Sequence, residues 1–347
     1  MGMMHLTDEE IIGYEALWDS MIKCKSGVLW KDSVAQFFLN GVNEVRKLSE
    51  ELENGTYKER PHHYFKVTSP KERDIMSISF RDRVYQRSLN DVAIYPEMTK
   101  HFIYDNGACQ RGRGTDFARN RMKCHLQRFF RKHGLDGYVL KMDIKSYYAT
   151  MRHDVAKATF AKYLDPNICE RADAILDGFP GEMGFNPGSQ IIQIAGISVL
   201  NDVDHYAKEQ LRIKHYIRYM DDTIIIGESK EQLRGWLNAL AEKLAEIGFT
   251  LHPRKTKITP IKDGFMFLGF EYRLTKTGKI IMTVDPKRVS AERRKLFRMA
   301  RLVKEGKMSE EKIRQCYGSW REHASHGNSW HMLQKMDSYF ENLMEGS

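Results

Sequence analysis

The 347-residue sequence predicts an α+β fold in which an antiparallel sheet is followed by a helical C-terminal unit. Apolar residues recur at three- and four-residue spacing over residues 8–57, which is typical of amphipathic helices. Runs rich in β-branched and aromatic residues at 137–151, 215–227 and 265–284 indicate strands. Each of the last two runs contains a turn between two strands. From Pro286 onward the pattern is helical again and strongly basic.

The remaining elements follow in chain order. The segments are strand, proline-containing turn and strand at 61–80, helices at 84–98 and 116–133, and a Gly/Pro-rich loop at 179–190 that leads into a helix. Ser229 and Gln232 have the spacing of a capping box, which predicts the start of another helix. The apolar residues of that helix fall on one face: Leu233, Trp236, Leu237, Leu240, Leu244 and Ile247.

Composition limits the class of protein. Hydrophobic residues make up 41% and charged residues 29%, as in ordinary globular proteins. No apolar run approaches the ~18 to 20 residues of a membrane span, and the acidic, mixed N-terminus is unlike a secretory signal. The five cysteines are scattered and lack C-x-x-C spacing, so we expect reduced thiols in a cytoplasmic protein, with no disulfide framework or zinc site.

The net charge of +9 is concentrated in two segments. Residues 111–134 carry eight Lys or Arg against one Asp, with phenylalanines interleaved, and residues 286–304 carry eight against one Glu. Either segment alone could be a solvated helix face. Two of them in one chain favour a track for a phosphate backbone, so nucleic acid is the expected partner.

The stretch HYIRYMDDTIIIG (215–227) places two adjacent carboxylates, Asp221 and Asp222, between strand-forming runs. One interpretation is a solvated hairpin turn, since Asp is common in turns. The other is a site for divalent cations, which carboxylate oxygens suit. Asp143, at the end of the apolar run in VLKMDIKSYY, supplies a third carboxylate. Three carboxylates can serve two Mg²⁺ ions of the kind that activate a 3′-hydroxyl and stabilise leaving pyrophosphate.

The same residues carry a resemblance to a family. YMDD between two strands, with an upstream D-x-x-x-Y-Y, resembles the reverse transcriptases. The stretches SPKERDI…FRDRVYQRSL, ACQRGRGTDFA and NPGSQ…Q resemble successive motifs of the bacterial enzymes related to group II intron maturases, and RKTKI (254–258) and FMFLGF (265–270) follow in the same order. The resemblance covers roughly residues 60–335.

The resemblance implies a right-hand polymerase fold. Its expected parts are an N-terminal helical extension (1–60), fingers (61–136), a palm interleaved with the fingers (137–285) and a helical thumb (286–347). It also implies an RNA-directed DNA polymerase that copies an RNA template from dNTPs by extending a DNA or RNA primer. The expected cofactor is a pair of Mg²⁺ ions, with Mn²⁺ as a substitute.

Site residues carried over from the family fall into three groups. Asp143, Asp221 and Asp222 would bind the metal ions, assisted by the backbone carbonyl of Ile144. Lys255 would protonate pyrophosphate as general acid, although Lys257 is close by. Residues at the incoming nucleotide would be Lys71 and Arg73 on the triphosphate, Tyr148 as the gate against a ribose 2′-hydroxyl, and Gly188, Ser189, Gln190 and Gln193 as the pocket floor. Without the family, Tyr148 is equally an ordinary core aromatic.

The nucleic-acid contacts implied are of two kinds. The primer grip would be Phe267, Leu268 and Gly269. The basic residues expected along the backbone are Arg111, Arg113 and Arg119 in the first basic segment and Arg294, Arg298 and Arg301 in the thumb helix.

The biological class is narrowed by the C-terminal string YGSWREHASHGNSWHML, which resembles reverse transcriptases of diversity-generating retroelements. Ile192 stands where those enzymes have Ser, whereas Gln193 keeps their glutamine. Bacterial or phage-encoded classes of unassigned role, including those acting in phage defence, therefore stay open. A structured non-coding RNA or a small accessory protein is an expected partner, and the oligomeric state is open.

Two other functions remain as alternatives. One is a maturase-like nucleic-acid-binding protein with an inactive polymerase fold, although such a protein has no need of three carboxylates. The other is template-independent nucleotide addition by the same fold. A small-molecule phosphotransferase is disfavoured because no G-x-x-x-x-G-K-[ST] loop occurs.

Overall fold

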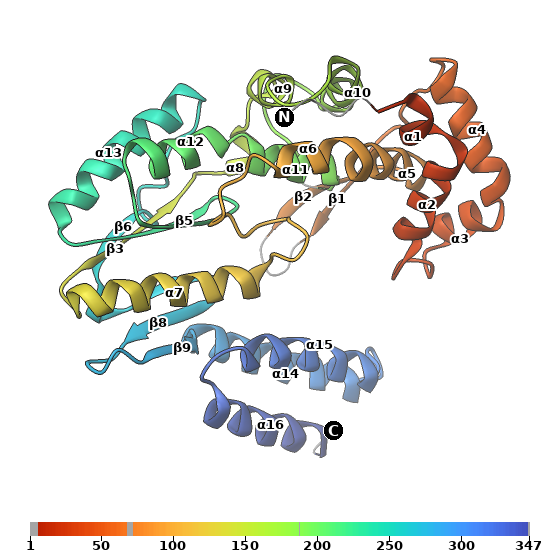
Figure 1. The fold of residues 1–347 in the computed structure, drawn as a ribbon. Helices are drawn as coiled ribbons and strands as arrows, with labels where there is room; N and C mark the ends of the chain where they lie inside the picture. The colour runs from red at the N-terminus through yellow and green to blue at the C-terminus, as the bar shows by residue number, and fades with distance from the viewer. Residues whose placement is uncertain (1–5, 68–71, 187, 346–347) are drawn as a thin grey trace.

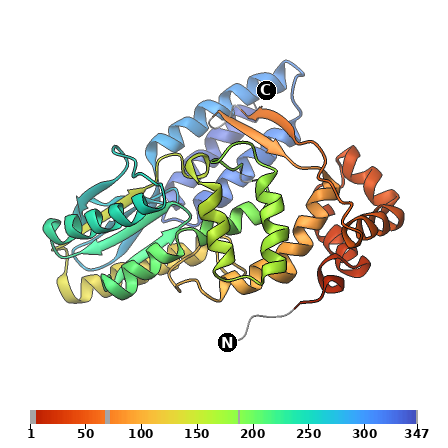
Figure 2. The same cartoon turned by 90° about the horizontal axis from the view of Figure 1, so that it is seen from above.

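The computed structural model describes residues 6–67, 72–186 and 188–345. Two antiparallel sheets lie one above the other, with helix α7 (Thr115–His133) between them (Figure 1). Further helices cover the outer face of the larger sheet, four short helices gather at one end, and three helices follow the smaller sheet (Figure 2). The expected α+β class with antiparallel sheets is confirmed.

The N-terminal helices form a small group that packs on the central helix α5 (Phe80–Leu89). They are α1 (Asp8–Ile12), α2 (Tyr14–Lys25), α3 (Asp32–Leu39) and α4 (Gly41–Glu53). Thr7 caps α1 through a capping box with Glu10. The helices predicted over residues 8–57 are therefore present, and their apolar faces are buried against one another.

The segment predicted as strand, turn and strand is a two-stranded hairpin of β1 (His63–Val67) and β2 (Arg73–Ser77). The predicted turn falls on residues outside the described ranges. Ser79 then caps α5, which continues through the π-helix η1 (Asn90–Ile94) into α6 (Tyr95–Thr99). All five residues of β1 are exposed, so this hairpin projects from the helices that follow it.

The larger sheet has the strand order β4-β5-β3-β6, all antiparallel. Its strands are β3 (Tyr138–Asp143), β4 (His215–Tyr219), β5 (Asp222–Gly227) and β6 (Lys257–Pro260). In β5, Ile225 packs on the helix-covered face, whereas Ile224 and Ile226 pack toward α7 and the smaller sheet. Because both faces are covered, the strand is continuously apolar instead of alternating.

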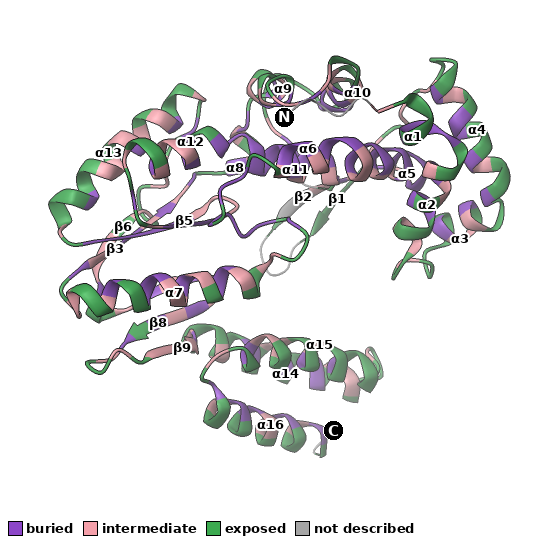
Figure 3. Ribbon diagram, in the orientation of Figure 1, coloured by how far each residue is buried: buried purple, intermediate pink, exposed green. Residues whose placement is uncertain are grey.

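Most helices over this sheet are amphipathic, but α11 is nearly all buried (Figure 3). The elements are α8 (Tyr147–Thr150), α9 (His153–Ala161), α10 (Pro166–Asp177), α11 (Gln190–Ser198), α12 (Asn201–His205), η2 (Tyr206–Gln210) and α13 (Lys230–Glu246). The capping box predicted at Ser229 is the actual start of α13, where the Ser229 hydroxyl accepts from the Gln232 amide. Helices α9 and α10 were not predicted from the sequence.

The smaller sheet contains three strands where the sequence predicted two. They are β7 (Phe265–Phe267), β8 (Phe270–Leu274) and β9 (Ile280–Val284), preceded by η3 (Ile261–Asp263). A two-residue turn at Leu268 and Gly269 splits the first predicted strand, and both residues have positive φ, 46° and 89°. That geometry suits a tight hairpin between twisted strands.

Three C-terminal helices complete the chain: α14 (Pro286–Lys304), α15 (Glu310–Ser325) and α16 (Trp330–Glu345). Their own core is formed by Leu296, Ile313, Tyr317 and Phe340 among others. The predicted helical C-terminal unit is thus observed. None of the helices in the described part of the chain is long and apolar enough to cross a membrane.

Candidate active site

Three carboxylates lie together at one end of the two central strands. Asp143 is the last residue of β3 and stands directly opposite Asp222, the first residue of β5. Asp221 precedes Asp222 in the turn between β4 and β5. The strand register therefore brings the third carboxylate beside the adjacent pair, as expected for a shared metal site.

The turn that carries Asp221 is tight and strained. Only Met220 and Asp221 separate the paired residues Tyr219 and Asp222. Met220 has a φ of 55°, in the left-handed region that residues with a side chain rarely adopt. Such a conformation persists only where the surrounding structure enforces it, and it is common at functional sites.

Burial disfavours the charged forms of Asp221 and Asp222. Burial raises the pKa of Asp222 to about 6, and the negative charges of Asp221 and Asp143 add to this while Lys141 opposes it. Burial also raises the pKa of Asp221, again with a contribution from Asp143. A cluster of this kind is stabilised by positive charge placed between its members.

Two lysines supply positive charge in this structure. The Nζ of Lys255 lies 3.0 and 3.1 Å from the two carboxylate oxygens of Asp143. The Nζ of Lys141 lies 3.1 Å from Oδ1 and 3.2 Å from Oδ2 of Asp222, and it donates to the Met266 carbonyl at 3.2 Å. Lys255 was predicted as a site residue, whereas Lys141 was not.

Lys141 could have been found from strand periodicity. It lies two residues before Asp143, so both side chains leave β3 on the same face. A lysine within the apolar run YVLKMD has to reach a carboxylate or solvent, and the nearest carboxylate on that face belongs to the site. Lys257, the other candidate for the general acid, begins β6 opposite Lys141. In the described residues, Asp143 pairs with Lys255 and Asp222 pairs with Lys141.

The donor set fits divalent metal ions. Among the residues that the structure describes, no three His, Cys, Asp or Glu side chains form a ready metal site, and Asp143 and Asp222 each pair with a lysine. Oδ1 of Asp222 is nevertheless buried and, beyond its ion pair with Lys141, accepts no hydrogen bond within the described ranges. Hard oxygen donors in small number are what Mg²⁺ uses when substrate phosphates complete its coordination.

A cleft of about 920 Å³ opens beside the carboxylates. Its walls come from the β1–β2 hairpin, α8 and the segment from Phe179 to Asn186, and its floor includes Ile144, Asp221 and Lys255. The size is that of a small-molecule site. Ile144 follows Asp143 and is buried.

Tyr148 lies in this cleft on α8. Its hydroxyl is buried without a hydrogen-bond partner among the described residues, and burial raises its pKa well above the ordinary value. The ring packs on α11 at Gly196, where an added Cβ would lie 2.9 Å from the Tyr148 hydroxyl oxygen. The hydroxyl end of the Tyr148 ring therefore occupies space that only a glycine at position 196 leaves open.

The expected pocket-floor residues have local structural roles and do not line this cleft. Ser189 caps α11 by accepting from the Ile191 amide at 3.2 Å, Gly188 packs against the Met76 carbonyl, and Gln190 begins α11. Gln193 lies one turn further, where its Oε1 is 4.0 Å from the Cys109 sulfur.

Two residues expected at the triphosphate can be placed only in part. Lys71 lies outside the described residues. Arg73 begins β2, beside the cleft residues Ile75 and Met76, but its side chain lies outside what the structure describes.

Part of the first basic segment is structural, while half of its Lys and Arg side chains are exposed. Arg119 is buried, where it bonds Asp116 at 2.7 Å and packs on the Phe270 ring, and Arg113 donates to three loop carbonyls. Arg111 is exposed. Phe129 is buried between the two sheets, so it belongs to the apolar face of α7 and offers no stacking surface for bases.

The second basic segment has its charge in solvent. Arg294, Arg298 and Arg301 are exposed on α14, around the exposed ring of Phe297. Phe267 is buried, while Leu268 and Gly269 form the β7–β8 turn against Arg288 and His323. The residues expected as primer grip and thumb therefore adjoin one another.

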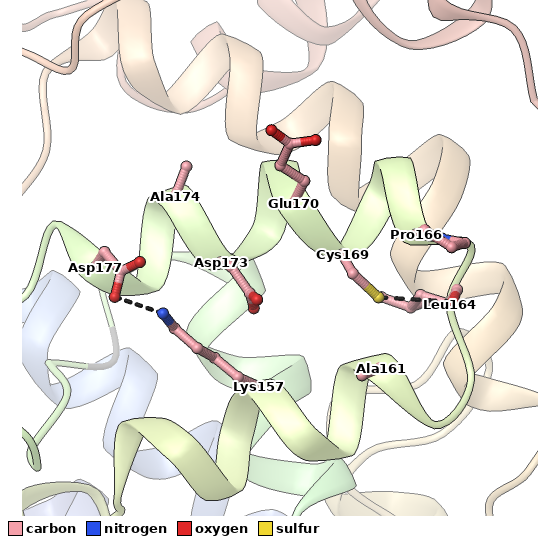
Figure 4. A pocket seen from close by; sticks show the side chains of 9 residues that line it. All are labelled: Lys157, Ala161, Leu164, Pro166, Cys169, Glu170, Asp173, Ala174 and Asp177. Atoms are coloured by element: carbon pink, nitrogen blue, oxygen red, sulfur yellow. Dashed lines mark hydrogen bonds and ion pairs between the residues drawn. The ribbon is translucent and has the colours of Figure 1, made fainter.

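A separate hollow of about 610 Å³ lies between α9 and α10 (Figure 4). Lys157 pairs with Asp177 at 2.6 Å across it, and Asp173 also faces it. It shares no lining residue with the cleft beside the aspartates.

Comparison with known proteins agrees with this geometry. The family described as "Reverse transcriptase (RNA-dependent DNA polymerase)" matches residues 66–272, more than half of the chain. No curated protein sequence matches the chain.

Solved structures with a similar fold include telomerases. A telomerase from Candida albicans in complex with a fragment of telomeric RNA has 11% identity and a TM-score of 0.50, covering 83% of this chain and 57% of that one. An apo telomerase from Candida tropicalis has 12% identity and a TM-score of 0.45, covering 64% and 48%. The chain spans about half to three-fifths of these proteins, and at such identity the likeness concerns the fold alone.

Proposed function

Since the chain belongs to the reverse transcriptase (RNA-dependent DNA polymerase) family, we propose that it synthesises DNA on an RNA template by nucleotidyl transfer at Asp143, Asp221 and Asp222. The observation that carries the proposal is the register of β3 and β5, which sets Asp143 against Asp222 beside an open cleft. A protein that only binds nucleic acid gains nothing from burying three carboxylates together, because their mutual repulsion destabilises the fold.

Asp143, Asp221 and Asp222 would hold two Mg²⁺ ions, with Mn²⁺ as a substitute and the Ile144 carbonyl as a further ligand. These ions would supply activation of the primer 3′-hydroxyl and neutralisation of pyrophosphate charge. Lys255 and Lys141 contact the carboxylates of Asp143 and Asp222, so bound metal ions would compete with both lysines for these oxygens. Lys255, which is half-exposed, would then be free to donate its proton to the leaving pyrophosphate.

The incoming dNTP would lie in the cleft of about 920 Å³, with its sugar against Tyr148. Its triphosphate would extend toward the β1–β2 hairpin, where Lys71 and Arg73 belong. Gly188, Ser189, Gln190 and Gln193 would act indirectly, by fixing α11 and the segment before it beside the nucleotide.

The chain would divide into an N-terminal extension (1–60), fingers (61–136), palm (137–285) and thumb (286–347). The exposed Arg294, Arg298 and Arg301 on α14 would bind the backbone of the template-primer duplex. Phe267, Leu268 and Gly269 would place the primer end, and Arg111 is the exposed member of the first basic group. Arg113 and Arg119 would support this surface from inside the protein.

The finer class we propose is a bacterial or phage-encoded enzyme of the diversity-generating or defence-associated type. The support is the sequence motif at the C-terminus, which forms α15 and the start of α16. A structured RNA or a small accessory protein would serve as its partner.

Primer extension tests the proposed function. Purified protein is given a defined RNA template, an annealed primer, dNTPs and Mg²⁺, and the product is sequenced beside that of the Asp221→Asn/Asp222→Asn variant. We expect a complementary cDNA from the wild type and none from the variant, which keeps the size of both side chains. Untemplated product would establish terminal addition instead, and extension that survives in the variant would remove the aspartates from the reaction.

A further inference from the structure

The turn that carries Asp221 is held from behind by a buried arginine. Arg218 lies in β4, is only 1% exposed, and is one of the largest fully buried side chains of the described residues. Successive residues of a strand face opposite sides of the sheet. Ile217 faces α7 and the smaller sheet, so Arg218 points the other way, under α11 and α12.

The guanidinium of Arg218 uses its donors on three separate elements. Nε and Nη2 bond the two carboxylate oxygens of Asp204 on α12 at 2.7 and 2.6 Å. Nη2 also donates to the Ile197 carbonyl of α11 at 3.0 Å, and Nη1 donates to the Met220 carbonyl at 2.9 Å. The planar fork of arginine permits this combination, which a lysine ammonium does not reproduce.

The backbone of Arg218 is fixed as well. Its amide donates to the Asp105 carbonyl at 3.1 Å, and its carbonyl accepts from the Gly107 amide at 3.0 Å. Asp204 is fully buried and accepts a further hydrogen bond from the Tyr216 hydroxyl at 2.6 Å. The arginine therefore occupies a single position relative to the helices and the loop before α7.

The bond to Met220 separates this arrangement from a purely structural ion pair. Asp204 compensates the charge of Arg218, whereas the remaining Nη1 donor is satisfied by the turn itself. The Met220 carbonyl belongs to the peptide that leads into Asp221, and Met220 has the strained left-handed φ. Fixing that carbonyl fixes the peptide plane, and with it the direction in which Asp221 leaves the turn.

We propose that Arg218, clamped by Asp204, is a positioning residue that holds Asp221 in the orientation needed to bind a divalent metal ion together with Asp143. This inference rests on the proposed function. Arg218 touches neither the cleft nor the carboxylates of Asp143 and Asp222 in the described structure, so it orients Asp221 through the turn. Its positive charge also lowers the pKa of Asp221, against the larger opposite effect of burial, and Arg218→Lys keeps that charge.

The test compares folded variants by their binding of Mn²⁺, measured by isothermal titration calorimetry. One variant replaces the whole cluster with apolar residues of similar volume (Arg218→Met, Asp204→Leu, Tyr216→Phe), since removing both charges of a buried pair is tolerated far better than removing one. A second variant, Arg218→Lys, keeps the charge that Asp204 needs but loses the fork. Circular dichroism and thermal melting confirm that each is folded.

We expect both variants to bind Mn²⁺ more weakly by about 10- to 100-fold, the range found when residues that orient metal ligands are removed. The control removes the pair between Arg81, which is buried on α5, and the partly exposed Glu51 on α4 (Arg81→Met, Glu51→Met), and it should keep wild-type affinity. If either the apolar triple variant or Arg218→Lys is folded and binds Mn²⁺ with wild-type affinity, the proposal is overturned. If the apolar variant does not fold, the affinity of Arg218→Lys alone decides.

The readout separates this inference from the proposed function. Mn²⁺ binding requires no DNA synthesis. A wild-type chain that binds Mn²⁺ but copies no RNA would therefore contradict the proposed function only. The role of Arg218 would still be decided by comparing the Mn²⁺ affinities of the variants with that of the wild type. Loss of Mn²⁺ binding in Asp221→Asn supports the assignment of the ligand. A wild-type protein that binds no Mn²⁺ at millimolar concentration would overturn the inference.

Discussion

At the scale of single residues, the positions of the site side chains depend on the buried residues that they pack against. Tyr148 illustrates this, because its ring is placed by Gly196 on α11 and by burial of its hydroxyl. An added Cβ at Gly196 would come within 2.9 Å of the hydroxyl oxygen and 3.0 Å of Cε1. Such a close approach cannot persist, and the ring is the part that is free to move.

We therefore predict that Gly196→Ala displaces Tyr148 and raises ribonucleotide incorporation several-fold, in the same direction as Tyr148→Ala. The measurement is the ratio of dNTP to rNTP efficiencies in single-nucleotide extension. Gly235→Ala on α13 is the control, since no described atom lies within 4 Å of its Cβ. It should add about 0.5–1 kcal/mol of stability without changing the ratio. An unchanged ratio in Gly196→Ala would contradict the prediction.

His215, at the start of β4, makes stability depend on pH. Burial and nearby positive groups lower its pKa from 6.5 to about 4; those groups are His125, Lys208, His133 and Arg128. Below pH 6.5 the unfolded chain takes up a proton that the folded protein refuses until about pH 4. The contribution of His215 to the free energy of unfolding is therefore fully present above pH 6.5 and is lost as the pH falls from 6.5 to about 4.

Urea unfolding at several pH values checks this expectation. The free energy of unfolding should fall less steeply between pH 6.5 and 4 in His215→Gln than in the wild type, because the variant has no proton to take up at that position. His331→Gln, on the exposed face of α16, is the control and should leave the slope as it is. Identical slopes for His215→Gln and wild type would show that other groups govern the acid response.

At the scale of elements, the β7–β8 turn joins the smaller sheet to the C-terminal helices. Gly269 has a φ of 89°, and an added Cβ there would lie 2.9 Å from Nη1 of Arg288 and 3.1 Å from Nε2 of His323. The residue thus needs glycine for two reasons, its backbone conformation and the close approach of α14 and α15.

We predict that Gly269→Ala destabilises the protein by more than the ~1–2 kcal/mol that a left-handed conformation alone requires. Gly306→Ala isolates that backbone effect, since Gly306 also has a positive φ of 66° but no described atom within 4 Å of its Cβ. Denaturant unfolding of both variants and of the wild type measures how much free energy of unfolding each substitution removes. Equal losses would mean that the turn does not pack on the helices.

The same scale shows what sequence patterns could and could not predict. Strand periodicity placed β3, β4 and β5, and with them Asp143, Asp221 and Asp222, because their apolar runs are long and their turn residues distinctive. Strand β6 was not predicted, since KITP is short and partly polar and becomes a strand only by pairing with β3. Its identification depends on tertiary contacts that the local sequence does not encode.

Individual partners were harder to predict than elements. Lys141 and Arg218 stand inside recognised strands, yet their roles follow from which carboxylate lies opposite across the fold. The basic residues of α7 show the reverse, since a charge pattern that indicated nucleic-acid binding includes the buried Arg119, paired with Asp116. Charge counting along a helix does not tell which side will be covered by a sheet.

At the scale of the whole molecule, the net charge of +9 predicts salt-dependent binding of nucleic acid. We expect the affinity for a template-primer duplex to fall with rising salt. Replacing Arg294, Arg298 and Arg301 with Gln should reduce the slope of log affinity against log salt by about 0.9 for each phosphate that the variant no longer neutralises. Fluorescence anisotropy with a labelled duplex measures the affinity at each salt concentration.

Arg321→Gln on α15, which breaks the pair with Asp337, is the control for that measurement and should leave the slope unchanged. A triple variant with the wild-type slope would show that α14 does not bind the duplex.

The fold brings these scales together at the cleft. The two-sided burial of the larger sheet fixes the ends of β3 and β5, Lys141 and Lys255 pair with the carboxylates there, and Arg288 of α14 lies next to the β7–β8 turn. Residues far apart in the sequence are thereby brought together by the fold.

The proposed function requires that the three aspartates copy an RNA base into a DNA nucleotide. Single-nucleotide addition examines this requirement on four RNA templates that differ only at the first unpaired base, with wild type and Asp222→Asn side by side. We predict that the wild type adds only the complementary dNTP on each template and that Asp222→Asn adds none. Addition that ignores the template base, or that continues in Asp222→Asn, would show that the aspartates do not carry out templated synthesis.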